Sequence, residues 1–189
     1  ESGRLGQIRT GAASGLATKY MAKDNVGTVG VIGSGFQARS QLEAICAVRD
    51  INQAKDFSRR EDRRNDFASR MSERLQVDII PVATSEECVS DSDVIVTITS
   101  SRDPVFNGDS LKEGSHVNAA GGNHWMRAEI DEKTVTRSSL IVVDDLEQAK
   151  VECGDLLLAE ARGTFRWDMA QELRDVIGGR VSKPSSAEG

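Results

Sequence analysis

Short apolar runs alternate along the chain with longer stretches in which apolar residues return at helical spacing. The runs are rich in Val, Ile and Thr, which is typical of β-strands. They lie at residues 28–32, 54–58, 78–82, 93–99, 115–119 and 140–143. The run at 93–99, Asp-Val-Ile-Val-Thr-Ile-Thr, suits a strand that is covered on both faces. We therefore expect six strands.

The stretches between these runs have the spacing of amphipathic helices. Thr84, followed three residues later by Glu87, matches the pattern of a helix capping box. Helices are predicted at 10–22, 61–75 and 84–89, and a further helix has a face marked by Ala38, Leu42 and Ile45. Another is expected to begin near Asp131. After Asp145 the pattern is again helical; it includes 167–177 and ends at Gly178 and Gly179.

This alternation of strands and helices indicates an α/β protein with a Rossmann-like, doubly wound parallel sheet and helices on both faces. In such a sheet the ligand binds outside the carboxyl ends of the strands, where the strand order reverses. We expect that point between the first and fourth strands. The residues that follow strands one, four and five are therefore the candidates for a binding site.

Composition narrows the classes of function. The chain of 189 residues is long enough for one domain, or for one domain and part of another. Its net charge of −6 argues against nucleic acid or an anionic membrane as the main partner, and no apolar stretch reaches the length of a membrane span. Three scattered cysteines indicate reduced thiols and a cytoplasmic location, and neither histidine has a partner at metal-ligand spacing. We expect a protein that acts on a small molecule, without a metal.

The first strand is followed directly by a glycine turn that opens a helix, Gly33-x-Gly35-x-x-Ala38. In this context the pattern predicts a dinucleotide site. Gly33 would permit the tight turn, Gly35 would let a pyrophosphate approach the backbone, and Ala38 would allow helix and strand to pack closely. The amides of Phe36 and Gln37 would donate to the phosphates. The alternative is an ordinary turn between a strand and a helix.

The end of the second strand bears on the choice between NAD and NADP. An acidic residue is expected there if the ribose carries a free 2′-hydroxyl, but the strand ends in Ser58, Arg59 and Arg60. A hydroxyl followed by guanidinium groups suits a 2′-phosphate, so NADP(H) is favoured over NAD(H). The alternative is that the arginines are solvated and that Asp56 or Glu61 contacts the ribose.

Three other segments could contribute to a site. Arg9 precedes the small residues 11–15, which could bring a helix N-terminus close to an anion while Arg9 binds a carboxylate, although a lone arginine is usually a solvated charge. Thr99 and Ser100 could line a cofactor groove, or could be simple polarity at a strand end. The glycines within 118–124, Asn-Ala-Ala-Gly-Gly-Asn-His, indicate a backbone close to a flat group such as the nicotinamide.

Several blocks of the sequence, in order, resemble the ornithine cyclodeaminase/mu-crystallin family. The resemblance covers residues 4–180 and implies a Rossmann domain at 25–145, preceded by a lead helix from a substrate and dimerisation domain at 1–24. A truncated C-terminal helical segment would occupy 146–189. Because the chain starts at Glu1 and lacks an upstream family Lys that binds substrate, we expect a fragment that is inactive alone and a homodimer at full length. The blocks are IRTGAASGLATKYMA, VGVIGSGFQARSQLEA, VTITSSRDPVF, HVNAAGGN, AEID and VVDDLEQAKVECGDL.

The resemblance also implies roles for individual residues. Arg9 would hold the carboxylate of a small amino or imino acid. Residues that follow the strands would bind the dinucleotide. The expected cofactor-binding residues are Thr10, Gly33, Ser34, Gly35, Phe36, Gln37, Ala38, Ser58, Arg59, Thr99, Ser100, Asn118 and Gly121.

Members of the family differ in activity, and one position separates them. Cyclodeaminases place an Asp after the glycine pair of the loop that follows strand five, whereas this sequence has Asn123. An amide cannot accept a proton as a carboxylate does. The sequence therefore favours reduction of a cyclic ketimine such as pyrroline-2-carboxylate, with Asn123 as the catalytic candidate. Ornithine cyclodeaminase, alanine dehydrogenase and a non-catalytic NADP-binding protein similar to the crystallins are the alternatives.

Overall fold

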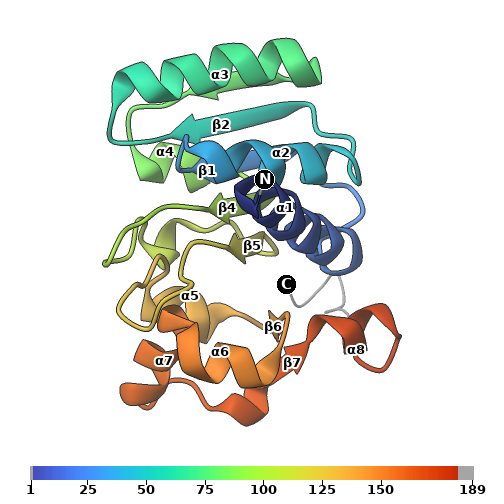
Figure 1. Cartoon of the computed structure of the whole chain (residues 1–189), viewed down its shortest axis with the longest axis vertical. Helices are drawn as coiled ribbons and strands as arrows, with labels where there is room; N and C mark the ends of the chain where they lie inside the picture. Colours follow the sequence, from blue (N-terminus) through green and yellow to red (C-terminus); the bar gives the residue numbers. More distant parts are fainter. Residues whose placement is uncertain (1, 183–189) are drawn as a thin grey trace.

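A five-stranded parallel sheet lies at the centre of the computed structural model, which describes residues 2–182 (Figure 1). The strand order places β1 beside β4, as expected for the switch point, and the α/β Rossmann-like fold is confirmed. The strands, in their order across the sheet, are β3 (Asp78–Pro81), β2 (Gln53–Phe57), β1 (Thr28–Ile32), β4 (Val94–Thr97) and β5 (His116–Ala119).

Helices cover both faces of this sheet. On one face, α2 (Phe36–Cys46) and α3 (Glu61–Leu75) pack with alternate residues of the strands into the main core. On the other face, α4 (Ser85–Val89) packs against β1 and β2, and it forms a second cluster with Ile95 of β4 and Phe106. Val94, Ile95 and Val96 of β4 are fully buried, so the expectation of a strand covered on both faces is confirmed.

Local signals in the sequence correspond closely to several element boundaries. The predicted strand 28–32 and the predicted helix 61–75 agree with β1 and α3. Thr84 caps α4, since its hydroxyl oxygen accepts a hydrogen bond from the amide of Glu87 at 3.1 Å. The carboxylate of Glu87 accepts in return from the amide of Ala83 at 3.0 Å.

The lead helix α1 (Ser2–Met21) begins eight residues before the predicted start at Thr10. Residues 11–15 therefore lie inside the helix, and the expectation that they bring a helix N-terminus to an anion is wrong. The small residues instead allow α1 and α2 to lie side by side (Figure 1). A Cβ on Gly11 would lie 2.5 Å from the carbonyl oxygen of Ser40, and one on Gly15 would lie 2.9 Å from the Cβ of Ala44.

The sixth strand does not join the main sheet. β6 (Ile141–Val143) pairs in parallel with β7 (Ala170–Glu172) to form a separate two-stranded sheet. The predicted helix 167–177 is therefore wrong in its first half, where a 3₁₀ turn (Trp167–Met169) and β7 precede the short α8 (Leu173–Ile177). The pairing of β7 joins distant segments, which local periodicity cannot reveal.

Further helices surround the small sheet and connect it to the main one (Figure 1). Phe165 is fully buried in a cluster between the small sheet and α7. Residues 183–189, the end of the expected C-terminal segment, lie outside the described residues. Within 2–182, no helix is both long and apolar enough to cross a membrane. The connecting elements are a 3₁₀ turn (Gly108–Ser110), α5 (Glu132–Arg137), α6 (Leu146–Glu152) and α7 (Gly154–Ala161).

Candidate functional site

The turn between β1 and α2 requires glycine at its first position. Gly33 has a φ of +115°, a left-handed conformation that side chains rarely adopt. A Cβ there would also overlap the carbonyl oxygen of Ile98, which follows β4. The Gly33 amide donates to the carbonyl of Phe57 at 2.8 Å, so the turn lies where the carboxyl ends of β1, β2 and β4 meet.

At position 35, no contact or backbone angle within the described chain requires glycine. It is the N-cap residue of α2, with an ordinary φ of −89°, and a Cβ added there would meet no atom within 4 Å. Among the described residues, no side chain caps the first turn of the helix. The first amides of a helix have no partner inside the helix and attract anions. The space beside Gly35 therefore fits a phosphate group that approaches the backbone.

A buried carboxyl group on β2 contacts the glycine turn through Ser34. Asp56 of β2 is fully buried, and its Oδ2 accepts a hydrogen bond from the hydroxyl of Ser34 at 2.7 Å. Burial raises the pKa of Asp56 to about 7, although the Ser34 hydrogen bond and the charge of Arg64 lower it in part. Asp56 Oδ1 has no hydrogen-bond partner among the described residues.

The arginine directly after Ser58 at the end of β2 has no side-chain partner in the described chain. Arg60 forms an ion pair with Asp62 at 2.5 Å, and Arg64 donates to the carbonyl of Ser58 at 3.2 Å. The Ser58 hydroxyl donates to the carbonyl of Arg60 at 3.1 Å. Arg59 is exposed and makes no hydrogen bond or ion pair with any residue in 2–182. Its guanidinium group is therefore available to a ligand.

The carboxyl ends of β4 and β5 are joined by Glu129, a residue that is not among the predicted site residues. This side chain is fully buried, and its carboxylate accepts three hydrogen bonds. The hydroxyl of Thr97 donates at 3.0 Å, the amide of Thr99 at 2.5 Å and the amide of Gly121 at 2.6 Å. The block Ala-Glu-Ile-Asp at 128–131 contains this residue, but Thr97 and Thr99 lie too far along the chain for a local pattern to indicate them as its partners.

A second buried carboxyl, Asp155 in the first turn of α7, holds the segment that carries Glu129. Its Oδ1 accepts from the amides of Glu129 and Ile130 at 2.6 and 3.0 Å. Burial raises the pKa of Asp155 to about 6. Side chains on the glycine pair would collide with these acids: a Cβ on Gly121 would lie 2.5 Å from Glu129, and one on Gly122 would overlap Asp155. Within the described residues, the lack of side chains at Gly121 and Gly122 therefore leaves room for the carboxyl groups of Glu129 and Asp155.

The two asparagines near β5 differ in environment. Asn123 follows the glycine pair and is exposed. Asn118 is buried, and its amide donates to the hydroxyl of Thr18 in α1 at 3.0 Å, while its oxygen lies 3.2 Å from Nε2 of His116. Burial lowers the pKa of His116 to about 4, so this imidazole is neutral at pH 7. Asn118 thus fastens β5 to α1, and His116 contacts the side-chain oxygen of Asn118 from the same strand.

The substrate candidate Arg9 lies on the N-terminal half of α1, beside the start of α2. Gln7 donates to the carbonyl of Phe36, and Ser40 donates to the carbonyl of Gln7 at 2.9 Å. Arg9 itself is exposed and forms no hydrogen bond or ion pair within 2–182. The Thr10 hydroxyl donates to the carbonyl of Gly6 at 2.9 Å, inside the helix.

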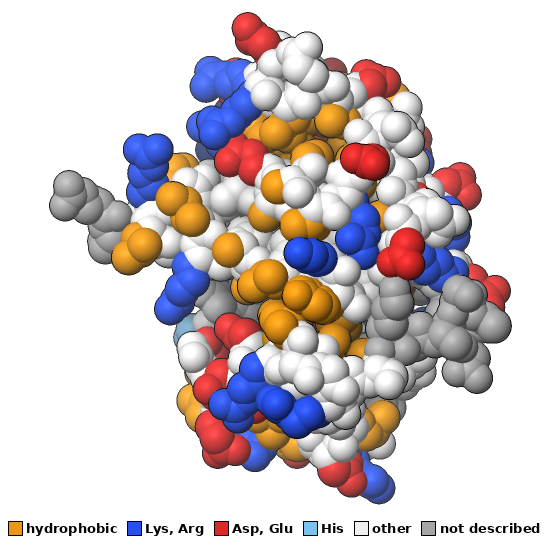
Figure 2. Space-filling view, turned by 90° about the vertical axis from the view of Figure 1, so that its right-hand side faces the viewer, with side chains coloured by type: hydrophobic (Ala, Val, Ile, Leu, Met, Phe, Trp, Pro, Cys, Tyr) orange, Lys and Arg blue, Asp and Glu red, His pale blue; other side chains and the backbone are white. Residues whose placement is uncertain are grey.

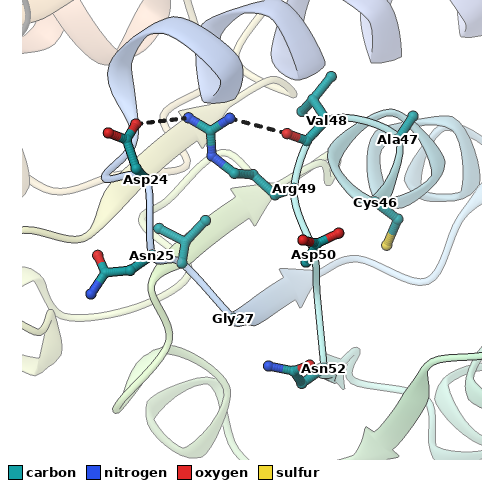
Figure 3. A pocket seen from close by; sticks show the side chains of 10 residues that line it. Asp24, Asn25, Gly27, Cys46, Ala47, Val48, Arg49, Asp50 and Asn52 are labelled. Atoms are coloured by element: carbon teal, nitrogen blue, oxygen red, sulfur yellow. Dashed lines mark hydrogen bonds and ion pairs between the residues drawn. The ribbon is translucent and has the colours of Figure 1, made fainter.

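A hollow of about 540 Å³ lies at the opposite edge of the sheet (Figure 3). Arg49 lies among the residues that line it, together with Asp24, Asp50 and Cys46. The guanidinium group donates to the carbonyls of Lys19 and Val48, near the C-terminal ends of α1 and α2. This arrangement stabilises helix ends, and it is separate from the glycine turn. No cluster of three or more potential metal ligands occurs in the described part of the chain.

Comparison with known proteins agrees with this geometry. The family model for the ornithine cyclodeaminase/mu-crystallin family matches residues 1–188. The chain is 35% identical over 189 residues to a Delta(1)-pyrroline-2-carboxylate reductase of Bacillus cereus, covering 100% of this chain and 58% of that protein.

Two solved structures have the same fold. The Thermococcus litoralis Delta(1)-pyrroline-2-carboxylate reductase in complex with NADH and L-proline has a TM-score of 0.93 and 34% identity, and the match covers 97% of this chain and 57% of that one. An archaeal alanine dehydrogenase dimer with bound NAD has a TM-score of 0.88 and 36% identity, covering 96% and 56%. The chain spans less than two thirds of the length of these relatives, and it belongs to the ornithine cyclodeaminase/mu-crystallin family.

Proposed function

We propose that this chain is the NAD(P)-binding part of an oxidoreductase that reduces a cyclic ketimine such as pyrroline-2-carboxylate. The observation that carries the proposal is the open space at Gly35. The turn leaves the N-terminus of α2 accessible there, and no contact within the described chain requires glycine at this position. The relative from Bacillus cereus and the solved Thermococcus litoralis reductase support the substrate class.

The dinucleotide would lie across the carboxyl edge of the sheet. The turn and the first amides of α2 would hold the pyrophosphate, with Ala38 packed beneath them. Thr99 and Gly121 lie on the strand ends that Glu129 joins, where the path continues toward the loop of Asn123. The full set assigned to the cofactor is Thr10, Gly33, Ser34, Gly35, Phe36, Gln37, Ala38, Ser58, Arg59, Thr99, Ser100, Asn118 and Gly121.

We favour NADP(H) over NAD(H). Arg59 supports this choice, since it directly follows Ser58 at the end of β2 and its side chain has no partner in the described chain, whereas Arg60 is paired with Asp62. Asp56, the acidic alternative for a ribose hydroxyl, is buried and bonded to Ser34. The solved relatives contain NAD or NADH, so the choice is a property to be tested on this protein.

The chemistry we propose depends on Arg9, Asn123 and the nicotinamide. The reduced nicotinamide, when bound, supplies the hydride that reduces a C=N bond. Arg9 would bind the carboxylate of the imino acid and orient it. Asn123 can donate and accept hydrogen bonds but cannot take up a proton, so it would orient the substrate rather than act as a base. This favours reduction over cyclodeamination.

Alanine dehydrogenation is the second candidate, because the archaeal alanine dehydrogenase matches nearly the whole chain.

One experiment separates the candidate functions. Full-length protein should be incubated with NADPH and pyrroline-2-carboxylate while the absorbance of the reduced nicotinamide is followed. Oxidation of NADPH supports the proposal. Ammonia release from ornithine without net change of cofactor would refute it in favour of cyclodeamination, and pyruvate formation from alanine would indicate the dehydrogenase. Tight NADPH binding without turnover would indicate a binding protein.

We propose a cytoplasmic homodimer for the full-length protein. The support for a partner surface is the exposure of large apolar side chains on α1, namely Leu5, Ile8 and Leu16. Apolar side chains also gather across the middle of the face drawn in Figure 2. The three cysteines are free thiols, which suits a reducing compartment.

A further inference from the structure

Two buried acids lie outside the groups that the proposed reaction uses, and both hold the loop that carries Asn123. The carboxylate of Glu129 joins the amide of Thr99, after β4, to the amide of Gly121, after β5. Asp155 fixes the backbone of Glu129 itself. We propose that Glu129 is a positioning residue, which sets the Asn123 loop against the end of β4 and so aligns the reacting groups for hydride transfer.

The contacts of Glu129 leave little freedom in this loop. All three groups around the carboxyl group are donors, two of them backbone amides, and its two oxygens accept from each of them. Because the side chain is fully buried, water cannot replace an acceptor that is lost. The last backbone hydrogen bond between the two strands runs from the amide of Ala120 to the carbonyl of Thr97 at 2.8 Å, and beyond it Glu129 joins the two strand-end loops.

The far side of the loop is equally closely packed. A Cβ on Gly154, the first residue of α7, would overlap the carbonyl of Arg127 and lie 2.6 Å from that of His124. The amide of Gly154 donates to the carbonyl of Gly122 at 3.3 Å. The loop from Gly121 onward is thus held between α7 and the end of β4, with Asn123 exposed between its fixed ends.

This arrangement has a consequence for the reaction. Hydride transfer is sensitive to the placement of donor and acceptor, and a displacement of about 1 Å can lower a rate by about a hundredfold. The inference rests on the proposed function, because it assigns Glu129 to the alignment of the nicotinamide and the imine. It does not require Glu129 to touch either of them.

The test replaces the carboxylate with an amide in the full-length protein. Glu129→Gln keeps the shape of the side chain, but its NH₂ group faces at least one of the surrounding donors. Without any nucleotide, the amides of Thr99 and Gly121 should exchange hydrogen faster than in the wild type. With NADPH and pyrroline-2-carboxylate, kcat should fall by about tenfold or more while the Kd of NADPH changes by less than about threefold.

An isotope effect separates alignment from simple support of the fold. With NADPH deuterated at the transferred position, misalignment slows the hydride step, so the primary isotope effect on kcat should rise in Glu129→Gln. Glu132→Gln is the matched control, since Glu132 lies three residues away, is partly exposed and makes an ion pair of 3.5 Å with Arg162. It should leave the exchange rates, kcat and isotope effect at wild-type values.

The outcomes are distinct. If Glu129→Gln matches Glu132→Gln in kcat and isotope effect, or loses only stability and NADPH affinity, the positioning role is refuted. If Glu129→Gln does not fold, Glu129→Asp keeps the carboxyl group but draws it back by one methylene from the amides of Thr99 and Gly121, and a normal isotope effect in that variant refutes the role. If the wild type does not oxidise NADPH with pyrroline-2-carboxylate, the proposed function is refuted. The alignment role is then refuted as well, whatever the hydrogen exchange of Thr99 and Gly121 shows.

Discussion

The buried carboxyl beneath the glycine turn should make the stability of this protein fall as the pH rises. Asp56 is fully buried with one oxygen unpaired, and its pKa is raised from 3.8 to about 7. The folded state therefore binds a proton more tightly than the unfolded state. Stability linked to this group is complete below about pH 3.8 and is lost as the pH rises through about 7.

The magnitude follows from the two pKa values. Each tenfold change in proton affinity corresponds to about 1.36 kcal/mol, so the ionised carboxyl costs the folded state about 4 kcal/mol at about pH 8. At about pH 5 the cost is less than half of this, because the group is then protonated in the folded state. Between these two pH values the free energy of unfolding should fall by about 3 kcal/mol through Asp56 alone.

Asp56→Asn removes this titration and keeps an oxygen that can accept from Ser34. Urea unfolding of the wild type and the variant should be measured from about pH 5 to about pH 8. The variant should gain stability relative to the wild type as the pH rises, by about 3 kcal/mol across this range. Other titrating groups, including Asp155, are common to both proteins and cancel in the difference.

Two further variants test the cause. Ser34→Ala removes the hydrogen bond that lowers the pKa of Asp56, so its stability should depend on pH more steeply than that of the wild type. Asp66→Asn, which removes an exposed carboxylate of α3, controls for the change in net charge and should follow the wild-type profile. Parallel profiles for the wild type and Asp56→Asn would show that burial does not perturb this group, and would refute the reasoning.

Three other predictions use pairs of similar residues or a single cap. Arg59→Ala should weaken NADPH by about tenfold or more and NADH little in fluorescence titrations, because a charge-assisted bond to phosphate contributes about 1.5–3 kcal/mol, whereas Arg60→Ala should weaken neither; an equal loss of both nucleotides would contradict this. Gly33→Ala should lower the melting temperature, since the turn is left-handed and closed, whereas Gly35→Ala should melt like the wild type but bind nucleotide weakly. Thr84→Ala should cost about 1 kcal/mol in urea unfolding, and no loss would show that the cap of α4 is dispensable.

Local sequence patterns determined much of this protein. The apolar run 28–32 and the helical spacing of 61–75 define β1 and α3, because side chains alternate across a strand and recur each turn of a helix. The glycine turn after β1 was predictable for the same reason, since its geometry depends on adjacent residues. The cap at Thr84 also needs only a residue three positions away.

Only the tertiary structure decided the groups that meet across long separations. Glu129 bonds to Thr97, Asn118 to Thr18, and β6 to β7, although each pair is far apart in the chain. Local periodicity reports which face of an element is apolar, whereas the partners of a buried polar group depend on how distant elements pack.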